Sequence, residues 1–456
     1  MNKDKLLHRS IYGLEEKFPE YSVRLWYNSK NRIYLFSLGI GLMMLQILTP
    51  SILNLLLFVL LNCLYFIAQT FKILLLSIGA LSRKESYIIG KNTLPIYTIL
   101  LPVYKEDKVL RKLVQSINKI DYPKDLLDVK LLIEEDDNKT INALKEIDLP
   151  EYFEVIKVPV SFPRTKPKAC NYGLQFAKGK YITIYDAEDA PHPKQLKEVV
   201  ERFKNVPDDV ICVQAKLNFF NREENSLTKL FAIEYSILFD YMLVGLKKLK
   251  MPIPLGGTSN HFIREKLEEL GGWDAFNVTE DADLGIRMHH AGYSSDIINS
   301  ITLEEAPITL SAWIKQRSRW IKGHLLTSLL HLNKYNKLSL REKLSVLLFL
   351  YIPNLIYILL PIYLLTCALS NEKEECELFW KINLYLAIIL PIGQSLFVIL
   401  TKKWNNMSLS IFQSVLYFFL MPIAGMKACL QIFKAPFYWD KTEHGISSYE
   451  KKIYNE

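Results

Sequence analysis

The sequence has few of the features that mark secreted, zinc-binding or nucleic-acid-binding proteins. Its six cysteines form no CxxC pair and show no regular spacing, so they suggest neither a disulfide framework nor a zinc site. The net charge of +8 is mild, and no basic run alternates with aromatic residues, which argues against a nucleic-acid partner. The first 32 residues are polar and mixed in charge, so we do not expect a cleaved signal peptide.

The composition combines an apolar and a charged character. Half of the 456 residues are hydrophobic, yet 23% are charged. Soluble enzymes are rarely so apolar and membrane channels are rarely so charged, so the composition predicts a soluble domain joined to membrane spans. An excess of Lys and Arg on the cytoplasmic side of a membrane accounts for the positive charge.

Two long apolar stretches predict transmembrane helices. Residues 33–81 are almost uncharged and break at Thr49-Pro50-Ser51. Because one span needs only about 20 residues, this stretch predicts a transmembrane hairpin. Residues 344–400 predict two more transmembrane helices, joined by an acidic loop that suits the outer side. The basic segment 1–32 is then expected in the cytoplasm.

The last apolar stretch, 408–433, is open to two interpretations. It contains Pro422 and Lys427 and precedes a basic tail at 434–456. A full membrane helix would put that tail outside, against the positive-inside bias. We therefore favour a helix that lies in the membrane interface.

Residues 90–305 alternate short β-rich runs with helical patterns. This alternation predicts a mainly parallel sheet with helices on both faces. Strands are expected at 97–103, 129–134, 155–158, 181–185 and 210–215, and helices at 107–119, 138–147, 168–178, 194–204 and 226–250.

An acidic cluster follows one of these strands directly. The run 181–185 leads into Asp186, Glu188 and Asp189, and prolines at 191 and 193 prevent the strand from continuing. Ligands of open α/β sheets bind at the carboxyl ends of strands. Clustered carboxylates are costly to hold together without a cation, which indicates a hard divalent metal bound to phosphate oxygens. The alternative is a solvated acidic turn.

Five short motifs occur in a distinctive order along the chain. They are ProValTyrLysGlu (102–106), GluGluAspAsp (134–137), AspAlaGluAsp (186–189), ThrGluAspAlaAsp (279–283) and Gln316-x-x-Arg319-Trp320. The ordered set resembles the membrane-embedded processive family 2 glycosyltransferases, which include bacterial cellulose synthase, hyaluronan synthase and mannan synthases. The resemblance implies an α/β GT-A (Rossmann-like) cytoplasmic domain inserted between transmembrane helices.

The resemblance also implies a donor site. Loop residues after the first strand contact the nucleotide, an aspartate after the second strand accepts hydrogen bonds from the base, and cations near a helix start suit the diphosphate. A glutamate stands where the family has the second Asp of Asp-x-Asp, and Mg²⁺ or Mn²⁺ remains the expected cofactor. The implied residues are Pro102, Tyr104 and Glu106; Asp136 and Asp137; Lys166, Lys168 and Asn171; and, for the metal, Asp186, Glu188 and Asp189.

The Thr279-Glu280-Asp281 motif is expected to begin a helix. Thr279 suits an N-cap and acids suit the first turn, which would explain the motif without catalysis. By resemblance, Asp281 is the catalytic base, with Asp283 a less favoured candidate. One general base fits direct displacement with inversion. Glu280, Gly257 and Thr258 are expected to line the substrate site.

Gln316, Arg319 and Trp320 share one face of a helix because they are spaced i, i+3, i+4. Residues 306–335 are expected to form interfacial amphipathic helices, in which Trp320 stacks on the terminal sugar and Arg319 pairs with phosphate. The alternative is an interfacial helix whose Trp and Arg meet lipid headgroups. The segment Phe437–His444 resembles a gating loop, with Lys441 and Thr442 at the nucleotide; the alternative is an unstructured tail.

The resulting hypothesis is an inverting glycosyltransferase of the inner membrane. It would pass a sugar from a nucleotide sugar to a growing β-linked polysaccharide and couple synthesis to export, with room for accessory export subunits. UDP-glucose is the first choice of donor, and GDP-mannose and UDP-N-acetylglucosamine stay open. The rivals are a non-processive enzyme with a lipid acceptor and, from another class, a membrane receptor or transporter with a nucleotide-binding module.

Overall fold

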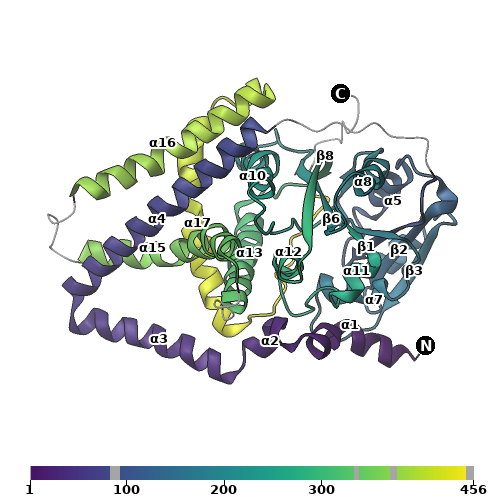
Figure 1. Cartoon of the computed structure of the whole chain (residues 1–456), viewed down its shortest axis with the longest axis horizontal. Helices are drawn as coiled ribbons and strands as arrows, with labels where there is room; N and C mark the ends of the chain where they lie inside the picture. Colours follow the sequence, from purple (N-terminus) through teal and green to yellow (C-terminus); the bar gives the residue numbers. More distant parts are fainter. Residues whose placement is uncertain (1, 83–92, 333–337, 370–376, 448–456) are drawn as a thin grey trace.

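The computed structural model describes residues 2–82, 93–332, 338–369 and 377–447. An α/β domain carries the sheet, and long apolar helices extend from one side of it. Figure 1 shows α3, α4, α15 and α16 reaching away from the domain, while α1 lies along its edge. The two parts meet around α13 (Leu310–Leu332), which packs against the last apolar helix, α17 (Ser410–Lys434).

The central sheet has eight strands in the order β3-β2-β1-β4-β7-β6-β8-β5. The first four strands in that order run parallel, β6 runs parallel to β8, and β7 is antiparallel to both of its neighbours. The strands are β1 (Tyr97–Val103), β2 (Leu127–Glu134), β3 (Phe153–Val158), β4 (Tyr181–Ile184), β5 (Ala190–Pro191), β6 (Val210–Phe219), β7 (Asn260–Ile263) and β8 (Ser294–Glu304).

The sheet is mixed but mainly parallel, as expected, because β1, β2, β3, β4, β6 and β8 all run in one direction. The two exceptions are β5 at the edge and β7, which lies between β4 and β6 and runs opposite to both. Strand β7 is only four residues long and begins with Asn260 and His261. Its sequence carries neither an apolar run nor an alternation, so no pattern identified it.

Helices cover both faces of the sheet and bury it. On β1, Ile99 and Leu101 pack into one hydrophobic cluster while Leu100 packs into the other, as the two-residue period of a strand requires. The helices of the domain are α5 (Leu110–Asn118), α6 (Asn138–Leu144), α7 (Lys166–Leu174), α8 (Gln195–Lys204), α9 (Ser226–Ser236), α10 (Leu243–Lys248), α11 (Arg264–Glu269) and α12 (Glu280–His290), with a π-helical turn at Ile237–Met242 between α9 and α10.

The amino-terminal segment is part of this domain's packing. Helix α1 (Lys3–Lys17) lies against α7, and the Asn171 amide donates to the Ser10 carbonyl over 3.0 Å. The short helix α2 (Val23–Trp26) is fixed by its first amide, because Val23 N donates to Asp274 Oδ2 over 2.7 Å. Residues 2–27 therefore lie on the same side of the apolar helices as the sheet.

Within the described residues, four apolar stretches are long enough to cross a membrane by length and composition. They are Ile52–Leu81, Leu340–Pro361, Leu384–Lys402 and Ser410–Lys434. They belong to α4 (Pro50–Leu81), the run from α14 (Leu340–Leu344) through the π-helical turn Ser345–Tyr351 to α15 (Ile352–Leu369), α16 (Glu377–Lys402) and α17.

The transmembrane hairpin at 33–81 and the outer position of the acidic loop stay predictions. Helix α3 (Ser29–Leu48) is separated from α4 at Thr49, but several side chains of α3 lie outside the described set. The acidic loop between α15 and α16 also falls outside the described residues. Helix α17 crosses the direction of α15 and α16 and packs against both, which suits a helix in the membrane interface (Figure 1).

Candidate active site

One cavity of about 770 Å³ joins the sheet to the apolar helices. It begins at the carboxyl ends of β1 and β4 and continues past α12 and α13 to α4, α15 and α16. It brings together most of the residues proposed from the sequence: Pro102, Tyr104, Glu106, Lys166, Asp186, Glu188, Gly257, Thr258, Glu280, Asp281, Gln316, Arg319, Trp320, Lys441 and Thr442. Five others, Asp136, Asp137, Lys168, Asn171 and Asp189, are not in its lining.

The acidic end of the cavity lies just after β4. Asp186 forms an ion pair with Lys166, and Glu188 Oε2 lies 3.1 Å from His444 Nδ1. Burial raises the pKa of Asp186. Burial acts in the same direction on Glu188, but the positive charge of His444 outweighs it and lowers the pKa of Glu188 to about 2. The pKa shifts of Asp186 and Glu188 therefore have opposite directions, although only one residue separates the two carboxylates.

Asp189 supports this turn from behind. Its Oδ2 accepts a hydrogen bond of 2.7 Å from the Asp186 amide and one of 2.5 Å from the Thr258 hydroxyl. Burial and the nearby Asp186 and Glu188 raise the pKa of Asp189 well above its usual range. This carboxyl orients the acidic turn, whereas Asp186 and Glu188 are the two that face the cavity.

A second group of side chains lies at the end of β1 and β2. Arg164 donates to the Tyr104 hydroxyl over 2.8 Å and pairs with Asp136 Oδ2 at 2.9 Å. Asp137 caps α6 through the Thr140 amide and also accepts from the Lys105 amide, so it fixes the loop after β1. Asp136 thus borders the cavity through Arg164, while Asp137 acts on the backbone.

Lys168 and Asn171 lie on the buried side of α7. Lys168 is fully buried and pairs with Glu134 at 2.7 Å. The Asn171 side chain donates to the Trp273 carbonyl over 2.7 Å and accepts from the Trp273 amide over 3.0 Å. Both side chains are therefore occupied in packing, and Lys166 is the residue of this helix that reaches the acidic end of the cavity.

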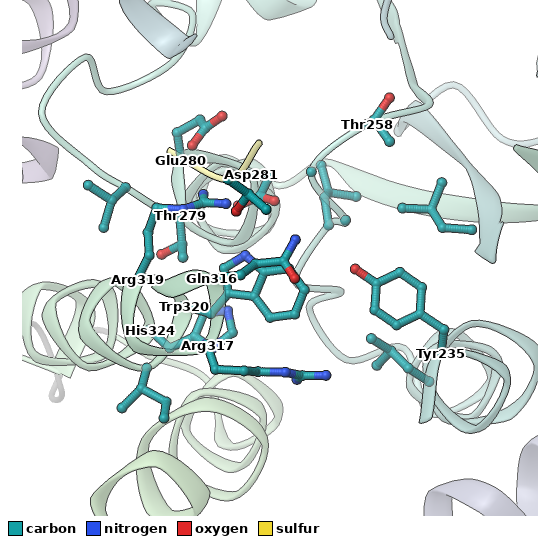
Figure 2. A pocket seen from close by; sticks show the side chains of 18 of the residues that line it. Tyr235, Thr258, Thr279, Glu280, Asp281, Gln316, Arg317, Arg319, Trp320 and His324 are labelled. Carbon is teal, nitrogen blue, oxygen red and sulfur yellow. The ribbon is translucent and has the colours of Figure 1, made fainter. Parts of the chain in front are cut away.

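Glu280 and Asp281 occupy the first turn of α12, opposite α13. Figure 2 shows both carboxylates with Arg319 above Gln316 and Trp320. A Cβ added to Gly257 would lie 3.4 Å from Asp281 Oδ2, so Gly257 is a neighbour of this carboxylate. Burial raises the pKa of Asp281, and burial together with Asp281 raises the pKa of Glu280 to about 8.

Asp283, the less favoured base, has a different environment. It is fully buried, pairs with Arg287 at 3.3 Å and lies 2.9 Å from His331 Nε2. Arg287 in turn donates to the carbonyls of Leu270 and Gly272. Asp283 therefore anchors α12 and does not line the cavity.

Helix α13 presents a polar and aromatic face to the cavity. The Trp320 ring centroid lies 6.3 Å from that of Tyr235, and the Arg317 guanidinium lies 4.8 Å from the Trp320 ring centroid. Arg317 binds both carboxylate oxygens of Glu234 on α9. This two-point contact with Glu234 fixes the Arg317 guanidinium. The Trp320 ring therefore lies between Arg317 of α13 and Tyr235 of α9.

The carboxyl-terminal segment after α17 covers the acidic end. Lys441 Nζ pairs with Glu106 Oε1 at 2.7 Å, and His444 Nδ1 lies 3.2 Å from the same oxygen. Further along, Glu305 accepts hydrogen bonds from the backbone amides of Gly445, Ile446 and Ser447. This part of the tail is ordered against the site, while residues 448–456 lie outside the described set.

Several cavity residues carried no recognisable signal in the sequence. His444 is the last residue of the proposed gating segment but had no role assigned to it, Arg164 precedes the Lys166 helix, and Glu234 lies in a long helical stretch. Each reaches the site through tertiary contacts with a segment far away in the chain. Arg317 lies inside the Gln316-x-x-Arg319-Trp320 motif, but the motif does not specify the residue at its position, so no role was predicted for it.

The acidic end fits a divalent metal that also binds the donor. Among the described residues, no three His, Cys, Asp or Glu side chains form a ready-made metal site. Asp186 and Glu188 offer two carboxylates, and Mg²⁺ commonly binds through one or two carboxylates completed by substrate phosphates and water. The residues present therefore suit a metal that arrives with a diphosphate.

Comparison with known proteins bears on the same region. A family model described as glycosyltransferase like family 2 matches residues 95–323. A probable glycosyltransferase of Bacillus subtilis, YdaM, is 27% identical over 325 residues, which cover 69% of this chain and 75% of that protein. A probable glycosyltransferase of Sulfolobus acidocaldarius is 25% identical over 370 residues, which cover 76% of this chain and 77% of that protein.

A solved structure shares the fold. The mannosyltransferase PcManGT from Pyrobaculum calidifontis, in complex with GDP-Man and Mn²⁺, aligns with a TM-score of 0.52 and 17% identity. The alignment covers 81% of this chain and 98% of that one. The predicted fold class, a GT-A α/β domain flanked by apolar helices, is confirmed.

Proposed function

The chain belongs to glycosyltransferase family 2 and is an enzyme that uses a nucleotide-sugar donor, and on that premise we propose that it transfers the sugar with inversion to a carbohydrate hydroxyl. The observation that carries the proposal is a single cavity lined both by the carboxylate pair after β4 and by Asp281. Direct displacement needs only a general base, the role proposed for Asp281, whereas a retaining enzyme would need a carboxylate nucleophile in addition.

Asp281 is the proposed general base. It lies at the cavity surface beside Gly257, and burial raises its pKa, which brings a carboxylate closer to the basicity that proton abstraction needs. It would accept the proton of the acceptor hydroxyl as that oxygen attacks the anomeric carbon. The Ala282 amide, Lys166 and Arg319 act against burial and lower the pKa of Asp281, which favours the ionised form that a base requires.

Asp186 and Glu188 are the proposed holders of Mg²⁺ or Mn²⁺. Such an ion neutralises charge on the departing nucleoside diphosphate. Lys166, already paired with Asp186, would turn toward the phosphates, and Lys441 would cover them from the tail. The Mn²⁺ and GDP-Man of the PcManGT complex support a metal-bound nucleotide sugar as the donor class.

We propose that Tyr104, Arg164 and Asp136 form the pocket for the nucleobase of the donor. A Tyr104 ring can stack on a base, and Asp136 can accept a hydrogen bond from a base N–H once Arg164 moves to a phosphate. Uracil offers such a donor, so UDP-glucose remains the first choice. GDP-mannose gains support from the name of the solved relative, and UDP-N-acetylglucosamine stays open.

For the acceptor we propose a growing β-linked glycan that stacks on Trp320. The aromatic pair of Trp320 and Tyr235 lies on the path from Asp281 to the apolar helices, which supports an acceptor that extends toward the membrane. The inner-membrane location with a cytoplasmic catalytic domain, and export by the same helices, stay predictions. A lipid-carried acceptor is favoured by a charged residue in the membrane end of the cavity, described below.

A donor panel tests this function. The full chain in detergent with Mg²⁺ or Mn²⁺ is offered radiolabelled UDP-glucose, UDP-N-acetylglucosamine and GDP-mannose, and the products are sized. Long product from one donor supports glycan growth, and short organic-extractable product supports a lipid acceptor. Neither transfer nor hydrolysis of any donor by the wild type, with Asp281→Asn as the matched control, would contradict the proposal.

A further inference from the structure

The active-site cavity does not end at Trp320 but continues between the apolar helices. This extension, which we call the membrane end, is lined by side chains from α4, α15, α16 and α17. Its polar members are Gln69, Lys72, Asn354 and Gln394, and aromatic rings surround them. Gln394 Nε2 is buried without a hydrogen-bond partner among the described residues. A polar lining in helices of this apolarity calls for a ligand or a functional role.

Lys72 is the notable charge in this extension. It lies within the candidate span Ile52–Leu81 and is half-buried. Across the described ranges, its ammonium group makes no hydrogen bond and no ion pair. Glu234 acts on it electrostatically, but that carboxylate is held by both Arg317 nitrogens and by the Tyr417 hydroxyl. With Glu234 neutralised by Arg317, Lys72 is a surplus positive charge in the membrane end.

The depth of Lys72 suits a lipid headgroup. Lys72 lies nine residues before Leu81, the last residue of α4, which is about 14 Å at 1.5 Å per residue. The end of α4 packs closely on the α/β domain, because a Cβ on Gly79 would lie 2.0 Å from the Tyr241 carbonyl oxygen. Lys72 therefore lies in the half of the span that is nearer the catalytic domain, and its long side chain can extend toward lipid phosphates on that side.

A series of electrostatic interactions and contacts leads from Lys72, through Glu234, to the proposed catalytic base. Glu234 is bound by Arg317, Arg317 lies over the Trp320 ring, and Trp320 neighbours Arg319, which acts on Asp281. Figure 2 shows the part of this series around Trp320, with Asp281 on one side of the ring and Arg317 on the other. Trp320 thus lies between the proposed catalytic base and the membrane end.

We infer that the acceptor glycan is carried on a lipid phosphate, and that Lys72 binds this phosphate while a sugar hydroxyl at the other side of Trp320 reaches Asp281. The inference rests on the proposed function and names its acceptor class. A neutral polysaccharide would leave the Lys72 charge in the membrane end unmatched, which is costly at low dielectric. A phosphate supplies the missing counter-charge, and its lipid tail fits the surrounding apolar helices.

The probe is farnesyl phosphate, compared with farnesol, which has the same tail without the phosphate. Binding of each to the full chain in detergent is measured for wild type, Lys72→Gln, Lys72→Arg and Lys434→Gln. Lys434 is a matched control, because it is exposed in the last turn of α17 and outside the cavity. Hydrolysis of the nucleotide sugar by each variant shows whether the donor site is intact.

We expect wild type to bind farnesyl phosphate more tightly than farnesol. Lys72→Gln should weaken the phosphate probe about 10- to 100-fold, the range of a charge-assisted hydrogen bond, and leave farnesol unchanged. Lys72→Arg should retain most of the binding, and Lys434→Gln all of it. Farnesyl phosphate should compete with the acceptor in transfer and should leave the KM of the donor unchanged.

Three results would overturn the inference without touching the proposed function. One is equal binding of both probes by a wild type that still hydrolyses donor. Another is competition by inorganic phosphate as strong as that by farnesyl phosphate, which would indicate a general anion site. The third is efficient transfer to a soluble oligosaccharide that Lys72→Gln leaves unaffected, which would indicate a free polysaccharide acceptor. Loss of donor hydrolysis in the wild type would instead refute the proposed function.

Discussion

The Arg319 guanidinium lies 4.3 Å from the ring centroid of Trp439, so the cavity face of α13 and the carboxyl-terminal tail meet directly. The same tail carries Lys441 and His444 to Glu106 and Glu188. The contact therefore couples a residue beside the proposed base to a segment over the proposed donor site. It gives the tail a defined closed position.

Loss of this contact should weaken donor binding. Cation–π contacts contribute about 0.5–2 kcal/mol, so Trp439→Ala is expected to raise the KM of the donor roughly 2- to 30-fold. Trp439→Phe keeps an aromatic face and should lie between wild type and the alanine variant. Initial rates over a range of donor concentrations measure the effect, and an unchanged KM for Trp439→Ala would mean that the tail does not cover bound donor.

Replacing the proposed base should separate binding from chemistry. Asp281→Asn keeps the size of the side chain but cannot accept the acceptor proton, so transfer should fall at least about 100-fold. Donor binding, measured by calorimetry with the nucleotide sugar, should stay close to wild type because Asp186 and Glu188 are unchanged. Turnover retained by Asp281→Asn would exclude this residue as the base.

The pH dependence of transfer should reflect the raised pKa of Asp281. Only the ionised carboxylate accepts a proton, so activity should fall as the pH drops through this pKa, above the ordinary Asp value of about 3.9. Arg319 lowers the pKa of Asp281, so Arg319→Gln should move the acid limb of kcat to higher pH, and Arg319→Lys should not. An acid limb at the same pH in all three proteins would contradict the assignment.

The sequence allowed the acidic turn and the α13 face to be located, because both depend on local patterns. A buried strand that leads directly into acidic residues fixes where Asp186 and Glu188 must lie, and helical spacing aligns Gln316 with Trp320. Position along the chain could not separate the two lysines of α7, since that helix is buried on nearly every side and only its packing turns Lys168 toward Glu134.

Long-range contacts account for what the sequence did not reveal. His444 reaches Glu188 only because the tail folds back from α17 across the sheet end, and no local pattern encodes that return. Strand β7 was missed because its four residues lack any periodicity, although its pairing with β4 sets the mixed sheet. Lys72 was visible as an exception in an apolar stretch, but its position in the cavity depended on how α4 packs.

Metal removal should stop the reaction reversibly. Treatment with EDTA is expected to abolish transfer, and Mn²⁺ or Mg²⁺ should restore it, because the carboxylate pair cannot neutralise a leaving diphosphate by itself. Glu188→Gln should prevent this rescue, whereas Glu188→Asp should retain part of it because a carboxylate remains. Full activity in EDTA would show that Lys166 and Lys441 carry the leaving-group charge without a metal.

Replacing Asp283 should lower the stability of the fold, whereas replacing Asp281 in the same turn of α12 should abolish transfer and leave stability nearly unchanged. Asp283 is fully buried against Arg287 and His331, so Asp283→Asn leaves a buried arginine without its carboxylate and should cost about 3–5 kcal/mol of folding free energy. Asp281→Asn, at the cavity surface, should change stability by less than about 1 kcal/mol. Thermal unfolding in detergent measures both, with the exposed Glu269→Gln as a control.

The comparison also tests the choice between the two candidates for the base. A stable Asp283→Asn protein that has lost all transfer, next to an active Asp281→Asn protein, would reverse the assignment. The expected pattern is a large fall in Tm for Asp283→Asn with activity lost in proportion to unfolding, and an unchanged Tm with no transfer for Asp281→Asn. The two measurements are independent, because the Arg287 pair stabilises α12 from the side that faces away from the cavity.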